Sequence, residues 1–360
     1  MIGERLRRTR MAKGLSLRAL SNQIGNRVSA QAIGKYERDE DMPGSDVLMA
    51  LTKALDIRPD HLVSTPDLVL DGVEFRKELP SARKERELEA RTLHAVERYL
   101  SVEDLLGLRS VDWQQPRGAP YPIEDLRDAE DAALSVRREW TLGNDPIPNL
   151  AELLEERGIK VLAFDIDGID GMAAQIRRKG REAARIIVVR RNIWAERKRF
   201  TLAHELGHHV LDVAPEVDAE KAAHRFASAF LMPADPIRAE VGAHRSSISL
   251  GELVDLKIRF RVSVQALTYR CKDLGIINGS TFSNLFDAFD QRGWRSPPFK
   301  EPACLDPEFE NPRRFERLCF RALTENAISE ARAAELLGIT SQELECRLDQ
   351  VEEQRKACLS

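Results

Sequence analysis

Residues 199–211 read RFTLAHELGHHVL and place two histidines, His204 and His208, four positions apart with Glu205 beside the first. The rest of this stretch is typical of a buried helix, which rarely holds three ionisable side chains so close together. On a helix, residues four apart lie on the same face. The pattern therefore predicts a helix that presents two imidazoles to one metal ion.

Zinc is the metal that this pattern favours. Imidazole nitrogen and carboxylate oxygen bind zinc at about 2.0–2.2 Å, and a site that keeps one position open is catalytic. Zinc lowers the pKa of its bound water toward about 7, and Glu205 can then take the proton of that water during attack on a carbonyl. By chance, the same five-residue pattern also occurs in proteins whose histidines share no metal. We predict one zinc ion per chain, bound by His204 and His208, with Glu205 as the general base.

A third protein ligand is needed, and the residues leave its identity open. A metzincin would have a histidine ten residues after His204, but this position is Ala214, so that class is excluded. On the next predicted helix, Glu220 and His224 stand four apart and share a face. Either of them could complete the site. Two aspartates near the loop between the helices are weaker candidates, Asp212 and Asp218.

The stretch ERKRFTLAHELGHHVL, followed by AEKAAHRFASAFLMP, resembles the ImmA/IrrE family of metallopeptidases. Three further blocks occur where that family has them, LGNDPIPNLAELLEERGIKVLAF, IDGMAA and RIIVV, so the resemblance covers roughly residues 140–275. It implies that Glu220 is the third zinc ligand. The family usually has Asn or Asp where this chain has His224. This departure leaves His224 as a residue that holds a ligand in place, as an alternative ligand, or as neither.

The resemblance also implies a function: an endopeptidase that cuts a repressor or a partner protein of a toxin system to relieve repression. A second interpretation is a non-enzymatic regulator, or an antitoxin-like protein, that keeps the metallopeptidase fold as a sensor or docking scaffold. The complete set of zinc-binding residues, together with Glu205, favours the enzyme. The change to His224 leaves room for the regulator.

The N-terminal end of the chain has a different character. Residues 1–38 carry nine basic and two acidic side chains, a balance of +7, whereas the whole chain has a net charge of −4. Such a basic head favours a polyanionic partner. Ser16 and Ser29 are placed to cap two short helices separated by Gly25, and two helices joined by a short turn form a helix-turn-helix.

The stretch LRALSNQIGNRVSAQAIGKYERDEDMP resembles the XRE-type helix-turn-helix repressors. In such a module the recognition helix enters the major groove of double-stranded DNA with its N-terminal residues at base edges. The resemblance assigns base contacts to four residues, Ser29, Ala30, Gln31 and Lys35. Four arginines are expected nearer the phosphates, Arg5, Arg8, Arg18 and Arg27. Gln31 can pair bidentately with adenine, whereas Leu17 replaces a glutamine that often contacts phosphate in that family.

We predict a mainly α-helical chain with a small β-sheet (α+β). The expected parts are a helix-turn-helix domain at 1–65, a helical and proline-rich linker at 66–122, a metallopeptidase domain at 123–275 and a helical C-terminal region at 276–360. Strands are expected at 159–164 and 185–190, the second being either a central strand or an edge strand open to a peptide. RRKGR at 177–181 indicates a hairpin tip, and the acidic tail suits a packing or dimer role.

The five cysteines show no CxxC spacing, and none lies near the histidine motif. This argues for a reducing cytosol and against disulfides or cysteine-bound zinc. No apolar run approaches the roughly 20 residues that a membrane span needs. We therefore expect a cytoplasmic protein with no membrane partner, which could form a homodimer.

Overall fold

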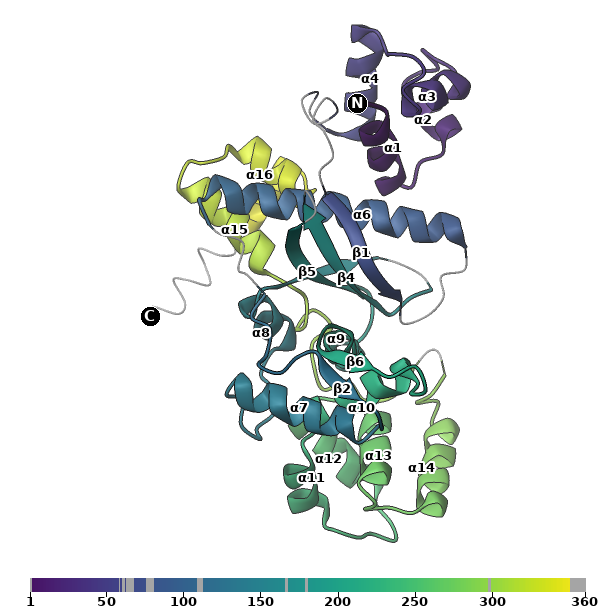
Figure 1. The fold of residues 1–360 in the computed structure, drawn as a ribbon, viewed down its shortest axis with the longest axis vertical. Coiled ribbons are helices and arrows are strands. Elements are labelled where there is room, and N and C mark those ends of the chain that lie inside the picture. The colour runs from purple at the N-terminus through teal and green to yellow at the C-terminus, as the bar shows by residue number, and fades with distance from the viewer. Residues whose placement is uncertain are drawn as a thin grey trace.

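The computed structural model describes residues 2–57, 59, 62, 68–75, 81–108, 113–165, 168–178, 181–296 and 299–349, without the side chains of 73–75 and 181–182. A helical head, a sheet covered by helices and a helical lobe follow one another along the longest axis (Figure 1). Helices dominate and the sheet is small, which confirms the α+β class. No helix in the described part of the chain is both long and apolar enough to cross a membrane.

The head is built from four short helices, α1 (Ile2–Ala12), α2 (Leu17–Gln23), α3 (Ala30–Glu37) and α4 (Ser45–Leu55). Ser16 caps α2 by accepting a hydrogen bond from the amide of Ala19, and Ser29 caps α3 by accepting one from Ala32, as the sequence predicted. Both caps satisfy amide groups that the first helical turn leaves unpaired. One apolar residue from each helix meets in the small core of the head, Leu6, Leu20, Ile33 and Leu51.

The main sheet contains β1 (Leu68–Phe75), β3 (Ile159–Phe164), β4 (Gly171–Arg178) and β5 (Arg181–Arg190), in the order β1-β4-β5-β3. β4 runs antiparallel to both neighbours, and β3 runs parallel to β5. β5 is therefore central, and its interpretation as an edge strand is wrong. The hairpin is confirmed because Arg178 pairs with Arg181, while the expected tip residues 179–180 lie outside the described part.

Alternate residues of the strands enter two separate cores, as the two-residue repeat of a strand requires. Val161 and Ile187 face one core, and Leu162 and Ile186 face the other. The second core is closed by α6 (Ala82–Leu105), α15 (Arg314–Thr324) and α16 (Glu330–Leu337). The first is closed by α8 (Leu150–Glu156), α9 (Ala195–Val210) and the helical lobe.

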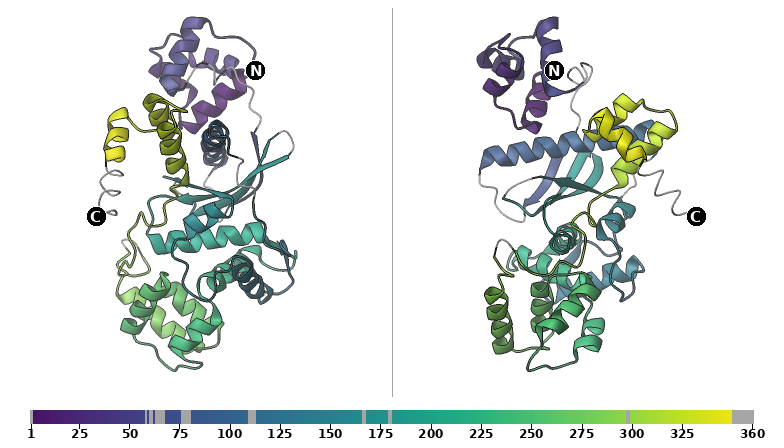
Figure 2. Two further views of the ribbon diagram at one scale, coloured as in Figure 1. Left: turned by 90° about the vertical axis from the view of Figure 1, so that its left-hand side faces the viewer. Right: turned by 180° about the vertical axis from the view of Figure 1, so that it is seen from behind.

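The lobe completes the molecule at the end opposite the head (Figure 2). Its helices are α7 (Asp128–Glu139), α10 (Ala219–Leu231), α11 (Ala234–Val241), α12 (Leu250–Phe260), α13 (Val264–Asp273) and α14 (Gly279–Gln291). A short parallel pair, β2 (Tyr121–Ile123) with β6 (Leu211–Val213), joins the segment before α7 to the end of α9.

The described residues of 66–122 do not form a linker, contrary to the sequence prediction. β1 pairs with β4, and α6 buries Leu88, Val96 and Leu100 against the sheet. The sequence does indicate a charged helix here with Leu88, Val96 and Tyr99 along one side, and the structure places all three in the core of the sheet. The expected boundary at 65/66 lies outside the described residues.

The C-terminal region is not separate either. Phe286 and Phe289 of α14 enter the core of the lobe, whereas Ala333 and Leu336 of α16 enter the core beneath α6. Between these two parts, residues 299–313 (the strap) return along α9. The packing role expected for the tail is therefore confirmed for its described residues.

A buried ion pair fixes the strap to α9. Arg199 and Glu310 form this pair with both side chains fully buried. The carboxylate of Glu310 also accepts hydrogen bonds from the amides of Leu150 and Ala151 at 3.0 Å, at the start of α8. One carboxylate thus joins the strap to two helices beneath the sheet.

Replacing this carboxylate should destabilise the fold strongly. Glu310→Ala leaves the Arg199 guanidinium buried without its counter-ion, which typically costs about 3–5 kcal/mol. Urea unfolding of the full chain measures the loss. Glu325→Ala is the control because it breaks an exposed pair with Arg321 on α15, where about 0.3–0.5 kcal/mol is expected. Equal midpoints for the two variants would contradict this role of Glu310.

Candidate metal centre

The histidine motif lies on α9 where this helix crosses α10. A Cβ added to Gly207 would lie 3.3 Å from the Cα of Ala223 and 3.3 Å from the Cδ1 of Phe226. The glycine therefore lets the two helices approach closely. Asp218 caps α10 by accepting a hydrogen bond from the amide of Lys221 at 3.1 Å. Together these features set the first turn of α10 against the histidines.

Three possible ligand atoms meet at this crossing. The Nε2 atoms of His204 and His208 are 3.1 Å apart, and each lies 3.3 Å from a carboxylate oxygen of Glu220. Ligand atoms bound at about 2.0–2.2 Å in a tetrahedral zinc site lie about 3.3–3.6 Å from one another. The spacing of these three atoms, and their chemistry of two imidazoles and one carboxylate, therefore fit a zinc ion.

Glu220 stays ionised in this setting. Burial raises the pKa of its carboxyl, but hydrogen bonds from His204 and His208 outweigh that effect, and the pKa is lowered overall. Its side chain is 45% exposed, whereas that of His204 is fully buried. The site is thus anchored in the core on the α9 side and open to solvent on the α10 side.

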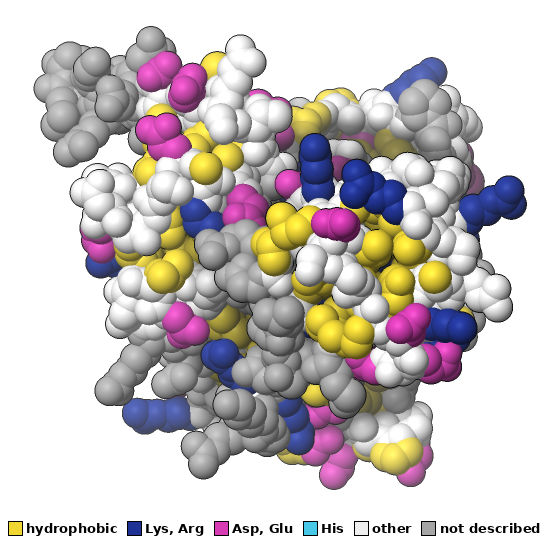
Figure 3. Space-filling model, turned by 90° about the horizontal axis from the view of Figure 1, so that it is seen from above, with side chains coloured by type: hydrophobic (Ala, Val, Ile, Leu, Met, Phe, Trp, Pro, Cys, Tyr) yellow, Lys and Arg dark blue, Asp and Glu magenta, His cyan; other side chains and the backbone are white. Residues whose placement is uncertain are grey.

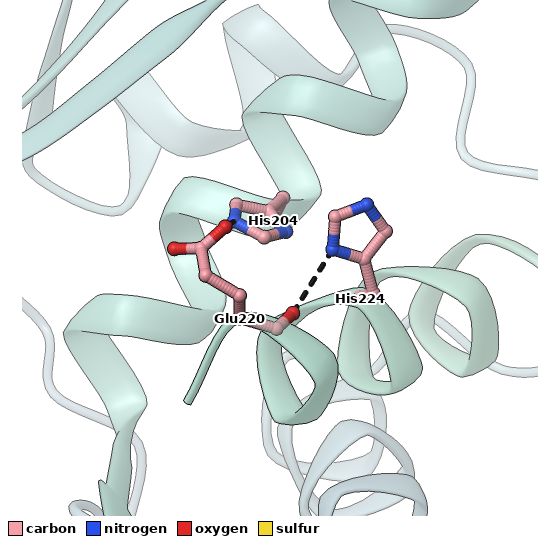
Figure 4. A group of neighbouring side chains, drawn as sticks. All are labelled: His204, Glu220 and His224. Atoms are coloured by element: carbon pink, nitrogen blue, oxygen red, sulfur yellow. Dashed lines mark hydrogen bonds and ion pairs between the residues drawn. The ribbon is translucent and has the colours of Figure 1, made fainter. Parts of the chain in front are cut away.

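His224 lies close to His204 but on a different side of it. Its ring centroid is 4.6 Å from that of His204, and its Nδ1 donates a hydrogen bond to the carbonyl of Glu220 at 2.9 Å. In Figure 4 the ring of His204 stands between the Glu220 carboxylate and the His224 ring. One nitrogen of His224 does lie within 4.8 Å of possible ligand atoms of His204 and Glu220. His208 lies closer to both His204 and Glu220, so it fits better than His224 as the third member of the ligand set.

Glu205 is fully buried and faces the start of β4. A Cβ added to Gly171 would lie 2.5 Å from the Oε1 of Glu205 and 2.4 Å from the Cγ2 of Thr201. Glycine at this position therefore makes room for the Glu205 carboxylate. The sequence did not reveal this role, although IDGMAA places the glycine at the beginning of an apolar segment.

His209 is a structural residue. It is buried, and its Nε2 lies 2.9 Å from the carbonyl oxygen of Ile186, so this nitrogen donates. The ring also packs near Trp113, with centroids 6.4 Å apart. Burial beneath the sheet keeps this histidine away from the ligand set.

In the head, the residues expected to contact DNA differ in whether their side chains are exposed and available. Gln31, Lys35, Arg18 and Arg27 are exposed. Ala30 is half-buried, and the hydroxyl of Ser29 already accepts the amide of Ala32 as a helix cap.

The structure does not support the phosphate contacts that were predicted for Arg5 and Arg8. Arg5 is buried and pairs with Glu97 of α6. Arg8 donates to the carboxylate of Glu4 at 2.6 Å and to the carbonyl of Leu68 at 3.0 Å. Both arginines face the sheet side because α1 is the helix that packs against α6. They hold the head on the body of the protein.

Comparison with protein families gives two matches. Residues 6–62 match the model of a helix-turn-helix domain family. Residues 154–272 match the model of the IrrE N-terminal-like domain, peptidase family M78. No curated protein matches the chain. The second match contains α9 and α10, and the first contains α2, α3 and α4.

Filling the space at Gly171 should disturb the centre. Gly171→Ala forces a methyl group into the Glu205 carboxylate, and overpacking of this kind costs about 1–3 kcal/mol. The control is Gly251→Ala on α12, where a Cβ would meet nothing within 4 Å, and this change should be neutral or slightly stabilising. Thermal unfolding of both variants provides the comparison. Equal stability of the two would show that Glu205 does not need the space.

Proposed function

We propose that this chain, which combines a helix-turn-helix DNA-binding domain with a peptidase-family domain, is a transcriptional regulator with zinc-dependent endopeptidase activity. The observation that carries the proposal is the set of His204, His208 and Glu220, whose ligand atoms lie 3.1–3.3 Å apart. The proposed ligands hold the ion on one face of α9, and Glu205 follows directly after the first of them. We expect the protein to act in the cytoplasm.

The chain's own residues support a hydrolytic role. Zinc, when bound, supplies a Lewis acid that polarises a carbonyl and lowers the pKa of water. The proposed general base is Glu205, which takes the proton from the attacking water. Its position suits this task, because it follows the proposed ligand His204 directly and is held against the start of β4. The half-exposed Glu220 marks the side from which a peptide could approach.

The proposed substrate is a repressor or a toxin-system protein. This part of the proposal rests on the resemblance of the α9–α10 region to ImmA/IrrE metallopeptidases and on the DNA-binding head in the same chain. A protease attached to such a head would act close to proteins bound on the same DNA. Cleavage would then change transcription directly.

A second candidate is a regulator without protease activity. The observation that favours it is the docking of the head, because Arg5 and Arg8 tie α1 to α6 and to β1. β1 pairs with β4, which begins beside Glu205. Binding of a metal or a protein at the centre could reach the head through these contacts without any cleavage.

We also propose that the DNA-binding form is a homodimer joined through α4. A hollow of about 1030 Å³ beside this helix is lined by apolar residues such as Ile24, Met49 and Ile57, and by the oppositely charged Asp46 and Lys53. Figure 3 shows apolar side chains gathered on the face seen from the head end. A surface with apolar groups and both signs of charge can complement a second copy of itself.

The metal ligands can be ranked by zinc affinity. The purified protein should hold about one zinc per chain. Glu220→Ala removes a ligand, whereas His224→Ala removes a residue that contacts ligands, a change that typically costs about 10–100-fold in affinity. We therefore expect Glu220→Ala to weaken zinc binding more, as measured by competition with a chromophoric chelator. The reverse order would make His224 the third ligand.

The variant Glu205→Gln distinguishes the protease from the regulator without protease activity. It should leave zinc content and DNA binding almost unchanged, while cleavage of the partner protein falls about 10²–10⁴-fold for lack of a general base. The measurements are a blot for fragments of the partner and a reporter under the native operator. His204→Ala is the control, because it should lose cleavage together with metal. Full derepression by Glu205→Gln would favour the regulator without protease activity.

DNA binding should weaken steeply with salt because phosphate neutralisation releases counter-ions. With the full chain and a random-sequence duplex, Arg18→Ala or Arg27→Ala should each lower the slope of log affinity against log salt by about one. The matched control is Arg292→Ala, an exposed arginine at the end of α14 in the lobe, which should leave the slope unchanged. Gln31→Ala should instead cost about 1–3 kcal/mol at one base pair of a preferred sequence. Equal slopes for all arginine variants would reject the assignment.

A further inference from the structure

A groove of about 740 Å³ lies where α6, β3 and α15 meet, apart from the metal centre. Residues 161–164 of β3 form part of its lining. Arg98 and Tyr99 of α6 line it from one side, and Phe315 and Phe320 of α15 line it from another. The left view of Figure 2 shows the C-terminal helices beside the end of α6. Sites for small molecules commonly have volumes of about 300–1,000 Å³.

The groove is lined by more basic than acidic residues, with Glu308 and Glu316 as its carboxylates. Among its lining residues, Arg347 pairs with Glu316 at 2.5 Å. Arg98, Arg191 and Arg313 also line it, and among the residues that the structure describes none of them forms a close ion pair, although Glu335 acts on Arg98 from farther away. Cations without counter-ions in a concave site favour a bound anion.

Among these arginines, Arg98 is the strongest candidate for binding an anion. Its Nε is buried and finds no hydrogen-bond partner in the described part of the chain. The guanidinium lies 5.8 Å from the ring centroid of Phe315. Burial lowers the pKa of Arg98, and the nearby charge of Glu335 opposes this effect only in part. A polar group left unsatisfied in this way costs free energy that a ligand could recover.

One backbone carbonyl on the outer edge of β3 is already hydrogen-bonded. The amide of Arg191 donates to the carbonyl of Phe164, which therefore faces β5, and the next carbonyl back, that of Ala163, faces outward. The guanidinium of Arg191 donates to this outward carbonyl at 2.8 Å. Strand addition would have to displace it. The groove thus favours a compact ligand over a peptide strand.

We propose that this groove binds a small amphipathic anion, with a carboxylate or phosphate group at Arg98 and an apolar body against the aromatic rings. Phe164, Phe315 and Phe320 are partly buried and supply apolar surface on two sides. Arginine recognises either head group through its planar fork of donors. The inference does not depend on protease activity.

Isothermal titration of the zinc-loaded full chain with three eight-carbon probes tests the site. Octanoate carries a carboxylate, octyl phosphate a phosphate, and octan-1-ol no charge. We expect at least one anion to bind with one site per chain, at least about tenfold more tightly than the alcohol, which corresponds to one charge-assisted hydrogen bond. Binding of only one anion identifies the head group. Absence of binding by both anions, or equal binding of the alcohol, overturns the proposal.

Variants locate the site. Arg98→Met keeps the apolar stem and should weaken anion binding at least about tenfold, whereas Arg98→Lys should retain part of it. Arg259→Met on α12 is the matched control, since this arginine pairs with Glu240 at 3.0 Å in the helical lobe and does not line the groove, and it should bind as the unmodified chain does. The exposed Arg313→Met serves if Arg98→Met fails to fold by circular dichroism. Wild-type affinity in the folded arginine variants of the groove would overturn the assignment.

Discussion

A helix that carries His204, Glu205 and His208 has to be buried and yet open to solvent on one side. The rest of the structure follows from this constraint. α9 lies beneath the sheet, with His204 and Glu205 fully buried, and only the side facing the start of α10 is left accessible through Glu220. Two glycines make the arrangement possible, because Gly207 admits α10 and Gly171 admits the Glu205 carboxylate. Small residues here matter as much as the ligands themselves.

The same helix is held in part by residues outside the matched peptidase segment, Glu301 and Glu310 of the strap. Arg199 meets Glu310 of the strap, and Glu196 meets Lys257 at 2.8 Å with both side chains fully buried. Lys257 in turn binds Glu301 at 2.7 Å. Buried pairs of this kind contribute little net stability, but breaking one is costly. These ion pairs therefore fix the position of the strap. Through the strap, the C-terminal residues pack as part of the same body as the peptidase-family domain.

Most of the elements that the sequence predicted correctly depend on local sequence patterns. The strand at 159–164, the α9 and α10 helices and the serine caps depend on neighbouring residues, and the sequence predicted each of them. The partners of β4 could not be predicted, because GMAAQIRR has few β-branched residues and β1 lies about a hundred residues earlier in the chain. Arg5 was misassigned for a related reason. A basic residue in a basic head resembles a phosphate contact until its partner, Glu97, is placed beside it by tertiary packing.

His224 shows how a departure from a family pattern can preserve a physical role. An asparagine or aspartate at this position would reach its neighbours through a short polar side chain. The imidazole instead donates from Nδ1 to the carbonyl of Glu220 and packs edge-on against His204, with an interplanar angle of 76°. Phe200 supports it on another side, with centroids 5.6 Å apart. These contacts restrain both the backbone that carries Glu220 and the ring of His204. Restraint of ligand orientation raises metal affinity without adding a ligand, so the histidine is compatible with an intact three-residue site.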